Sequence, residues 1–229
     1  IKNFLQKLMQ VRNKIKKWKL EVLVVDDNSP DKTWKIVQEE IKKKSWIHLI
    51  KRDKKVGLGA AYLAGMENAF NERKADVVLT MDADLSHNPL YIPKFLEKIE
   101  KGSDLVIGSR YVIGGSIPQE WALHRKIYSI LGNKAVSFFL GFEHISDWTS
   151  GYRALTKNVF TKVKYQVQSR ITQGYTFNIS FAYNTLIQGF QVDHLPIKFP
   201  DRMMGKSKLG FEYLIHTPIF LIKTRLKRN

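Results

Sequence analysis

The sequence predicts an α/β fold with a mainly parallel central sheet flanked by helices. Apolar segments of strand length alternate with amphipathic segments of helix length along the first half of the chain. The predicted strands are apolar at consecutive positions, which is typical of strands that are buried on both faces of a parallel sheet. Two of these strands end in acidic residues, and ligands bind beyond the carboxyl ends of such strands.

The elements of the first half follow from these two patterns. Helices are predicted over residues 2–17, 33–44, 59–72 and 88–101. Strands are predicted over residues 20–25, 47–50, 77–81 and 105–107. Asn88 is the expected N-cap of the last of these helices, because Pro89 follows it in the first turn.

The second half of the chain is less regular. Spacing of apolar residues predicts helices over residues 123–140, 177–188 and 210–226, and a strand over residues 192–197. Pro218 is expected to kink or break the last helix, because proline lacks the backbone N–H that a helix interior uses.

The composition excludes several classes of protein. Of 229 residues, 44% are hydrophobic and 12% aromatic, so the chain can bury a full core and is not a disordered chain. The absence of cysteine excludes a disulfide framework, a thiolate metal site and a cysteine nucleophile. No apolar run approaches the roughly 20 residues that cross a bilayer, and the lysine-rich first residues do not read as a signal peptide.

The net charge is unusually positive. Lys and Arg number 38 against 21 Asp and Glu, which gives +17; residues 1–20, 42–55 and 202–229 together carry +19, so the rest of the chain carries −2. Such basic segments favour anionic partners, namely lipid headgroups, nucleic acid or phosphorylated ligands. The alternative is that these lysines only solvate the exposed faces of helices.

The pair Asp82 and Asp84 is the sharpest chemical signal in the sequence. Two carboxylates that are separated by one residue at a strand end can both turn toward one divalent cation. Oxygen ligands of this kind suit Mg²⁺ or Mn²⁺, which also takes phosphate oxygens from a substrate. The alternative is an acidic turn that caps the following helix.

Other polar residues give weaker signals. Asp26 and Asp27 can accept hydrogen bonds from a base or a ribose, although the DDNSPD run in which they lie also suits an ordinary turn. Gly57 opens a helix after a basic loop and can let a phosphate approach the backbone. Four arginines outside the lysine-rich runs could bind phosphate through two parallel hydrogen bonds, or form ordinary surface ion pairs: Arg110, Arg125, Arg153 and Arg202. His87, His124 and His144 show no metal-ligand spacing and are interpreted as structural.

Seven ordered segments resemble the motifs of family 2 glycosyltransferases, in particular the polyprenyl-phosphate sugar transferases of the dolichyl-phosphate mannosyltransferase type. They are residues 24–33 (VVDDNSPDKT), 57–62 (GLGAAY), 81–89 (MDADLSHNP), 108–111 (GSRY), 125–129 (RKIYS), 147–153 (DWTSGYR) and 201–209 (DRMMGKSKL). The resemblance covers about residues 20 to 212.

The resemblance implies a GT-A (Rossmann-like) glycosyltransferase fold with C-terminal amphipathic helices. It also implies an inverting transfer of mannose from GDP-mannose to dolichyl or polyprenyl phosphate, with Mg²⁺ or Mn²⁺ as cofactor and release of GDP. The alternative within the same fold is transfer of glucose or another sugar from a UDP-sugar. A nucleic-acid-binding protein is disfavoured, because the basic segments lack recognition motifs and the sheet-end carboxylates repel phosphate.

The resemblance also assigns roles to individual residues. The predicted nucleotide contacts are Asp26, Asp27 and Gly57, and the predicted metal ligands are Asp82, Asp84 and Ser86. The residues expected to hold the acceptor phosphate and the donor diphosphate are Arg110, Arg125, Ser129, Arg202 and Lys208. Asp84 is expected to assist alignment of the acceptor. Two positions depart from the pattern: Ser86 stands where archaeal relatives carry glutamine, and Met204 stands where some relatives carry arginine.

The expected organisation is a single GT-A catalytic domain over residues 1–229, which lacks the family's first strand at its N-terminus. Residues 210–229 are expected to form an interfacial helix and tail. The lipid acceptor implies a peripheral position on an anionic membrane surface, on its cytoplasmic face, with a membrane-anchoring subunit as a further expected partner.

Overall fold

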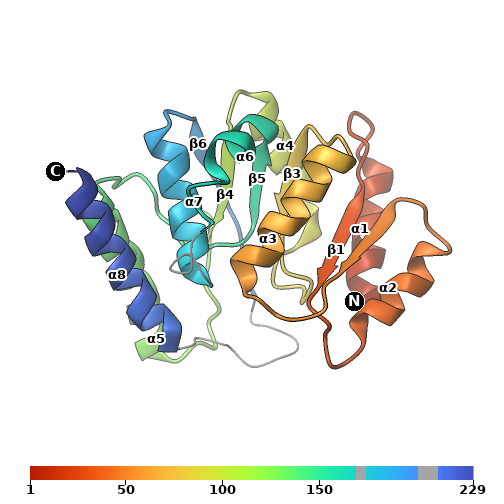
Figure 1. The fold of residues 1–229 in the computed structure, drawn as a ribbon, viewed down its shortest axis with the longest axis horizontal. Helices are drawn as coiled ribbons and strands as arrows, with labels where there is room; N and C mark the ends of the chain where they lie inside the picture. The colour runs from red at the N-terminus through yellow and green to blue at the C-terminus, as the bar shows by residue number, and fades with distance from the viewer. Residues whose placement is uncertain (169–173, 201–210, 229) are drawn as a thin grey trace.

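The protein is an α/β structure in which the strands fall into two sheets. The computed structural model describes residues 1–168, 174–200 and 211–228. Strands β1 (Val22–Asp26) and β2 (Ile47–Lys51) form a parallel pair. The second sheet has the order β3-β5-β4-β6, from β3 (Val77–Thr80), β4 (Leu105–Ser109), β5 (Arg153–Thr156) and β6 (Val192–Pro196). Helices cover both faces of the strands (Figure 1).

The second sheet contains one antiparallel strand, which adds a detail to the predicted, mainly parallel arrangement. β4 and β6 are parallel, but β5 runs antiparallel to both β3 and β4. The sequence analysis did not predict β5, because this strand has only four residues and begins with the charged Arg153. It also missed the short helix α6 (Lys157–Val163) that follows directly.

Most predicted helices are present with small shifts of their ends. They are α1 (Lys2–Lys14), α2 (Thr33–Ile41), α3 (Leu58–Glu67), α4 (Ile92–Glu100), α5 (Leu123–Leu140), α7 (Tyr175–Ile187) and α8 (Phe211–Arg228). A π-helical turn, Asn68–Glu72, extends α3, and a 3-10 turn, Pro89–Tyr91, precedes α4. The Asn88 side chain accepts the Leu90 N–H at 3.1 Å, which confirms the predicted N-cap.

Helix α8 continues through Pro218, so the helix is not broken there. Proline removes one backbone hydrogen bond, but α8 packs against α5 and α7, and such tertiary contacts outweigh a local cost. The hydroxyls of Thr176 in α7 and Thr217 in α8 lie 3.0 Å apart and are both buried.

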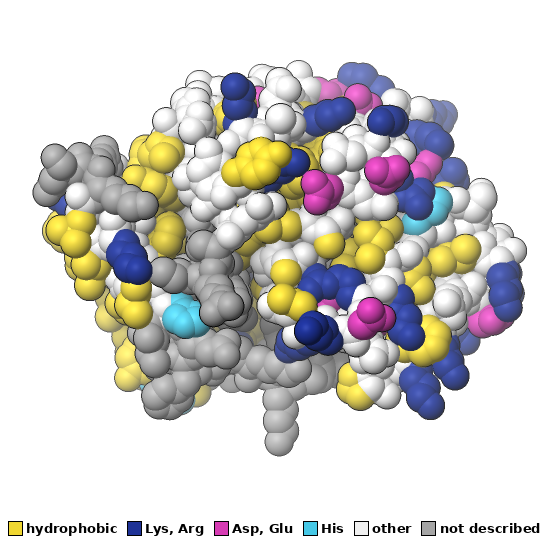
Figure 2. Space-filling view, in the orientation of Figure 1, with side chains coloured by type: hydrophobic (Ala, Val, Ile, Leu, Met, Phe, Trp, Pro, Cys, Tyr) yellow, Lys and Arg dark blue, Asp and Glu magenta, His cyan; other side chains and the backbone are white. Residues whose placement is uncertain are grey.

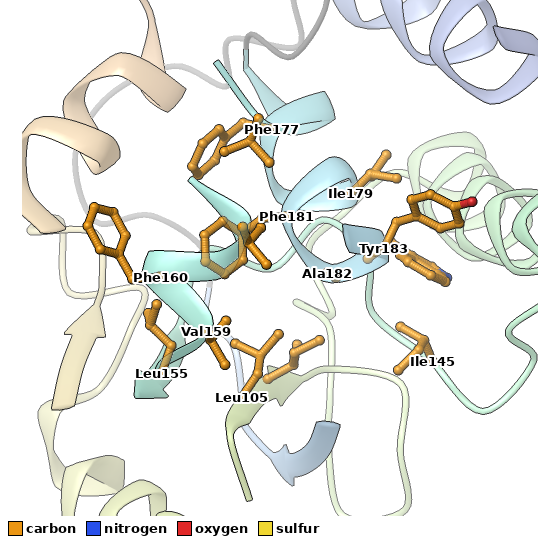
Figure 3. Packing of buried hydrophobic residues seen from close by; sticks show 14 of the residues in the cluster. Leu105, Ile145, Leu155, Val159, Phe160, Phe177, Ile179, Phe181, Ala182 and Tyr183 are labelled. Carbon is orange, nitrogen blue, oxygen red and sulfur yellow. The ribbon is translucent and has the colours of Figure 1, made fainter. Parts of the chain in front are cut away.

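Alternate residues of the central strands enter different parts of the core. Leu105 and Ile107 of β4 pack under α6 and α7, whereas Val106 between them packs with Phe95 of α4 on the opposite face. Figure 3 shows the first of these clusters, where Phe177 and Phe181 of α7 meet Phe160 of α6. Burial on both faces explains why the strand sequence is continuously apolar.

Helix α5 buries polar side chains and exposes large apolar ones, the reverse of an ordinary amphipathic helix. Its buried residues include the polar Asn133 and Ser137, while the side that faces away from the core is apolar. The exposed large apolar residues of α5 are Leu123, Ile127, Tyr128, Ile130, Leu131, Phe138 and Phe139. α5 and α8 lie side by side at one end of the molecule (Figure 1), and Figure 2 shows apolar side chains gathered along that end.

Candidate active site

The paired carboxylates lie in a tight turn directly after β3. Leu85 has a left-handed backbone (φ 69°), which is uncommon for a residue other than glycine and bends the chain back sharply. The Asp84 Oδ1 atom accepts hydrogen bonds from the Ser86 N–H (3.0 Å) and from the Ser86 hydroxyl (2.5 Å). Ser86, a predicted metal ligand, therefore contacts the carboxylate of Asp84 and fixes its orientation.

His87 holds the other carboxylate residue through the backbone. The Asp82 N–H donates to His87 Nδ1 at 2.8 Å, and the imidazole is buried and stacked on the ring of Tyr152. Burial lowers the pKa of His87, although the nearby carboxylates of Asp82 and Asp84 act in the opposite direction. Sequence reasoning interpreted this histidine only as structural, because its spacing showed no metal-ligand pattern.

Asp26 and Asp27 lie where β1 ends, at the same lower edge of the molecule in Figure 1 as the turn after β3. Asp26 is buried and its Oδ1 accepts the Ser29 N–H at 2.8 Å, which closes the predicted turn. Asp27 Oδ1 lies 3.2 Å from Arg52 Nε. Asp27 Oδ1 and Arg52 Nη1 are both buried without a hydrogen-bond partner among the described residues, so they can accept and donate to a ligand. Gly57 (φ 115°) starts α3 at this edge.

Arg110 does not extend into solvent, as a simple phosphate-binding arginine would. Its Nε and Nη2 atoms donate to the two carboxylate oxygens of Asp147, both at 2.8 Å, and Nη2 also donates to the Thr149 hydroxyl. Asp147 is fully buried. Burial alone would raise its pKa, but the guanidinium of Arg110 outweighs burial and holds the pKa of Asp147 below its ordinary value.

Aromatic rings bring the predicted acceptor residues toward the turn. The Phe199 ring is contacted by the guanidinium of Arg110 (5.4 Å), by Trp121 (6.4 Å) and by His87 (5.5 Å). Arg125 in turn stacks on Trp121 at 3.8 Å. The sequence did not single out Phe199 or Trp121, because isolated aromatic residues are usually core residues.

The predicted Ser129 lies on α5 beside the same cluster, and its hydroxyl is 2.5 Å from the Tyr111 hydroxyl. A groove of about 550 Å³ opens next to this pair. It is lined by Tyr111, by one face of α5, and by Glu143, Ile145 and Ser146. The side chains of Ile130, Phe138 and Ile145 supply its apolar lining.

The segment 147–153 joins these parts, and Arg153, which the sequence offered as a phosphate-binding or surface arginine, is instead buried and donates to backbone carbonyls. The Trp148 N–H donates to Asn133 of α5, and Arg153 donates to the carbonyls of Trp148, Ser150 and Asn178. Burial lowers the pKa of Arg153 to about 10, which leaves its side chain charged at neutral pH. The Gly151 carbonyl accepts the Thr80 hydroxyl of β3 at 2.7 Å.

The predicted site residues thus fall into three groups. Asp82, Asp84 and Ser86 form one turn, Asp26 and Asp27 with Gly57 lie at the ends of neighbouring elements, and Arg110, Arg125 and Ser129 lie on the side of α5. Arg202 and Lys208 lie outside the described residues.

The donor set fits a divalent cation whose shell is completed by a substrate. The described residues contain no group of three or more His, Cys, Asp or Glu side chains that could hold a metal by themselves. Two carboxylates held by a rigid turn match the way Mg²⁺ is usually bound, by one or two carboxylates together with phosphate oxygens and water.

The fold defines the class of the protein. It resembles the structure of glucosyl-3-phosphoglycerate synthase from Mycobacterium tuberculosis in complex with Mn²⁺, uridine diphosphate and phosphoglyceric acid. The TM-score is 0.63 at 15% identity, over 98% of this chain and 73% of that chain. A second complex of the same enzyme, with glucosyl-3-phosphoglycerate, gives a TM-score of 0.62 at 16% identity, over 99% and 75% of the two chains. The fold is therefore GT-A-like, as the sequence predicts.

The profile of glycosyl transferase family 2 matches residues 2–164, so the chain belongs to this family and is a glycosyltransferase. It is 38% identical over 192 residues to the polyprenol monophosphomannose synthase of Mycolicibacterium smegmatis, over 83% of this chain and 71% of the relative. It is 36% identical to the undecaprenyl-phosphate mannosyltransferase of Micrococcus luteus, over 83% of this chain and 76% of the relative.

A third relative is the dolichol-phosphate mannosyltransferase of Pyrococcus furiosus, which is 36% identical over 217 residues. The match covers 90% of this chain but only 56% of that longer relative. No helix among the described residues is long and apolar enough to cross a bilayer.

The buried pair of Arg110 and Asp147 gives a prediction for stability. Asp147→Asn should lower the free energy of unfolding by about 3–5 kcal/mol at pH 7, because it leaves a guanidinium buried without its counter-charge. Since the pKa of Asp147 in the folded protein lies below its ordinary value of about 4, the contribution is complete above that value and is lost only as the pH falls through the folded pKa.

Urea unfolding at pH 7 and pH 5 should therefore give the same difference between Asp147→Asn and the native protein. Glu143→Gln, an exposed position in the same loop, is the matched control and should change the free energy by less than about 0.5 kcal/mol. A difference for Asp147→Asn that shrinks between pH 7 and pH 5 would contradict this account.

Proposed function

We propose that the protein transfers mannose from GDP-mannose to a polyprenyl phosphate such as dolichyl phosphate, with inversion at the anomeric carbon. The observation that carries this proposal is the rigid turn with Asp82 and Asp84 at the end of β3, in a family 2 chain. Three relatives with 36–38% identity, each named for transfer of mannose to a polyprenyl or dolichol phosphate, support the choice of sugar and acceptor.

The end of β1 would bind the guanosine of the donor. A guanine base presents a ring N–H and an amino group side by side, and a carboxylate can accept both. Asp27 Oδ1 lies 3.2 Å from Arg52 Nε but accepts no hydrogen bond among the described residues, and Arg52 Nη1 is a buried donor without a hydrogen-bond partner. Gly57 at the start of α3 would let the diphosphate approach backbone N–H groups.

Asp82 and Asp84 would hold Mg²⁺ or Mn²⁺ together with the donor diphosphate. The bound cation supplies positive charge that stabilises the departing diphosphate. The chain contributes the fixed geometry, since Ser86 orients Asp84 and His87 anchors the backbone of Asp82. The oxygen of Ser86 lies in the same turn and would be a further oxygen ligand.

The acceptor would enter from the side of α5. Arg125, placed by its stacking on Trp121, and the hydroxyl pair of Tyr111 and Ser129 would bind the lipid phosphate. Arg110 would act at the edge of this site, with its guanidinium orientation set by Asp147. The apolar groove that begins at Tyr111 would receive the first part of the polyprenyl chain. Arg202 and Lys208 are proposed to contribute to the same phosphates.

The reaction needs little help from a general base. The acceptor phosphate is already an anion, and its oxygen attacks the anomeric carbon while the bond from that carbon to the diphosphate oxygen breaks. The electron pair leaves with GDP. The protein therefore acts mainly by positioning the two phosphates and by stabilising the negative charge that develops on the leaving group. Asp84 would also help to align the acceptor.

A transfer assay with radiolabelled GDP-mannose, a short polyprenyl phosphate and Mg²⁺ or Mn²⁺ tests the proposal. Label should enter the organic phase and EDTA should prevent this. Asp82→Ala and Asp84→Ala should each lower the rate by at least about 10²–10³-fold, because each removes a carboxylate from the metal turn. Asp76→Ala, close in sequence but before β3, is the control and should leave the rate within about twofold.

If the protein transfers sugar from UDP-glucose but not from GDP-mannose, it is still a glycosyltransferase, but the proposed donor is wrong. Full activity in the Asp82→Ala or Asp84→Ala variant would overturn the role of the turn.

We further propose that the apolar face of α5 and α8 lies on an anionic membrane surface. Among the described side chains of α8, the exposed large apolar ones are Ile219, Ile222 and Leu226. Helix α5 carries Arg125, Lys126 and Lys134 and no acidic residue. Apolar side chains that enter the headgroup region, with lysine and arginine beside them, are the usual features of an interfacial helix. The position would place the groove next to the acceptor lipid.

Replacing an exposed phenylalanine of this face should weaken membrane binding without affecting folding. Phe138 is 74% exposed, so Phe138→Glu should change the free energy of unfolding by less than about 0.5 kcal/mol. It should lower binding to phosphatidylcholine–phosphatidylglycerol vesicles by about tenfold or more, because an apolar ring no longer enters the interface.

Tyr165→Glu is the matched control, since Tyr165 is 70% exposed and follows α6, outside this face. Equal loss of vesicle binding in both variants would contradict the assignment of the face. Vesicle binding by the chain alone would also make the predicted membrane-anchoring subunit unnecessary for docking.

A further inference from the structure

Asp82 and Asp84 are anchored in different ways. Asp84 is fixed through its side chain, because Ser86 donates two hydrogen bonds to Oδ1. Asp82 is fixed through its backbone, because its N–H donates to Nδ1 of His87 at 2.8 Å. The left-handed backbone at Leu85 lies between the two anchors. A non-glycine residue in this conformation costs energy, so the surrounding contacts must hold the turn closed.

The imidazole of His87 is itself held on several sides. It is 3% exposed and stacks on Tyr152, with ring centroids 4.9 Å apart, and its edge meets Phe199. Tyr152 is buried, and its hydroxyl donates to the carbonyl of Asn88, the residue after His87. Tyr152 therefore contacts both the imidazole of His87 and the backbone next to it. The imidazole cannot rotate without disturbing these contacts.

The contact with Asp82 identifies the nitrogen of His87 that acts as the acceptor. An imidazole nitrogen accepts a hydrogen bond only when it carries no proton, so the bond from the Asp82 N–H requires an unprotonated Nδ1. The proton of the neutral ring then lies on Nε2.

We propose that His87 is the positioning residue of the Asp82–Asp84 turn, and that its Nδ1 atom, as the acceptor of the Asp82 N–H, places Asp82 for metal binding. The inference rests on the proposed function, since the turn is taken there as the metal site. In this proposal, the positioning of Asp82 depends on the hydrogen-bond acceptor at Nδ1 more than on the aromatic ring of His87.

Two substitutions separate the acceptor from the ring. His87→Phe keeps the stacking on Tyr152 but removes the acceptor. His87→Asn removes the ring but keeps an acceptor oxygen close to the position of Nδ1. His124→Phe, on the exposed side of α5, is the control for loss of a histidine. The readouts are the Mn²⁺ dissociation constant in the presence of GDP, from electron paramagnetic resonance of free Mn²⁺, and the unfolding temperature.

His87→Phe should weaken Mn²⁺ binding about tenfold, the size of one net hydrogen bond. His87→Asn should weaken it less than about threefold, even though loss of the buried ring lowers the unfolding temperature. His124→Phe should leave both quantities unchanged. Mn²⁺ affinity that follows the unfolding temperature, with His87→Asn as weak as His87→Phe or weaker, would overturn the proposal.

The ¹⁵N NMR spectrum of the native protein tests the bond without metal or nucleotide. The imidazole signal that disappears in His87→Phe should show an unprotonated Nδ1 and a protonated Nε2, and the opposite tautomer would overturn the proposal. If the NMR result is as expected but the native protein binds no Mn²⁺ with GDP, the proposed metal site fails instead. The bond would then be structural only.

Discussion

The site depends on one buried charge, the carboxylate of Asp147. A carboxylate without water is tolerated only when it is paired and hydrogen-bonded, and here Arg110 and the backbone N–H of Ser150 meet that requirement. The chain must turn tightly around this group. The same turn brings Arg153 to α7 and presents the Gly151 carbonyl to β3. Donor side and acceptor side are thus joined by a single short segment.

The close packing around this segment explains why residue 151 is glycine. A Cβ atom at Gly151 would lie 2.5 Å from the hydroxyl of Tyr62 in α3, and 3.8 Å from the imidazole of His87. The backbone of the 147–153 segment therefore packs directly between α3 and the turn that follows β3. This contact fixes the position of α3, which begins at the predicted phosphate site, relative to the turn that follows β3. We infer that substitutions here would disturb both halves of the site.

The sequence predicted the layers of the fold well, because long-range burial leaves a periodic pattern in each element. In β4, for example, Val106 and its neighbours Leu105 and Ile107 are all apolar, because helices cover both faces of the strand. β5 was missed because its first residue is the buried Arg153, whose charge is satisfied by three backbone carbonyls that no local pattern reveals. For the same reason the antiparallel direction of this strand could not be predicted.

For the site, the sequence predicted residues whose chemistry is local. Asp82, Asp84 and Ser86 form one turn because they are neighbours in the chain. Partners that only the fold brings together were not predictable: Asp147 for Arg110, Trp121 for Arg125 and Tyr152 for His87. Arg110 is an example: the sequence predicted only that it binds phosphate, whereas in the structure it forms an ion pair with the buried Asp147. The resemblance to known motifs named these residues without giving the contacts that the fold makes around them.

The most direct test of this account is the stoichiometry of Mn²⁺ binding with GDP. The account predicts one Mn²⁺ per chain, bound tightly only when the nucleoside diphosphate is present, because the two carboxylates of the turn would supply only part of the ligands and the phosphates would supply others. It also predicts that the double substitution Asp82→Asn and Asp84→Asn removes this binding while the protein stays folded. Equal Mn²⁺ binding by the native and doubly substituted proteins would contradict it.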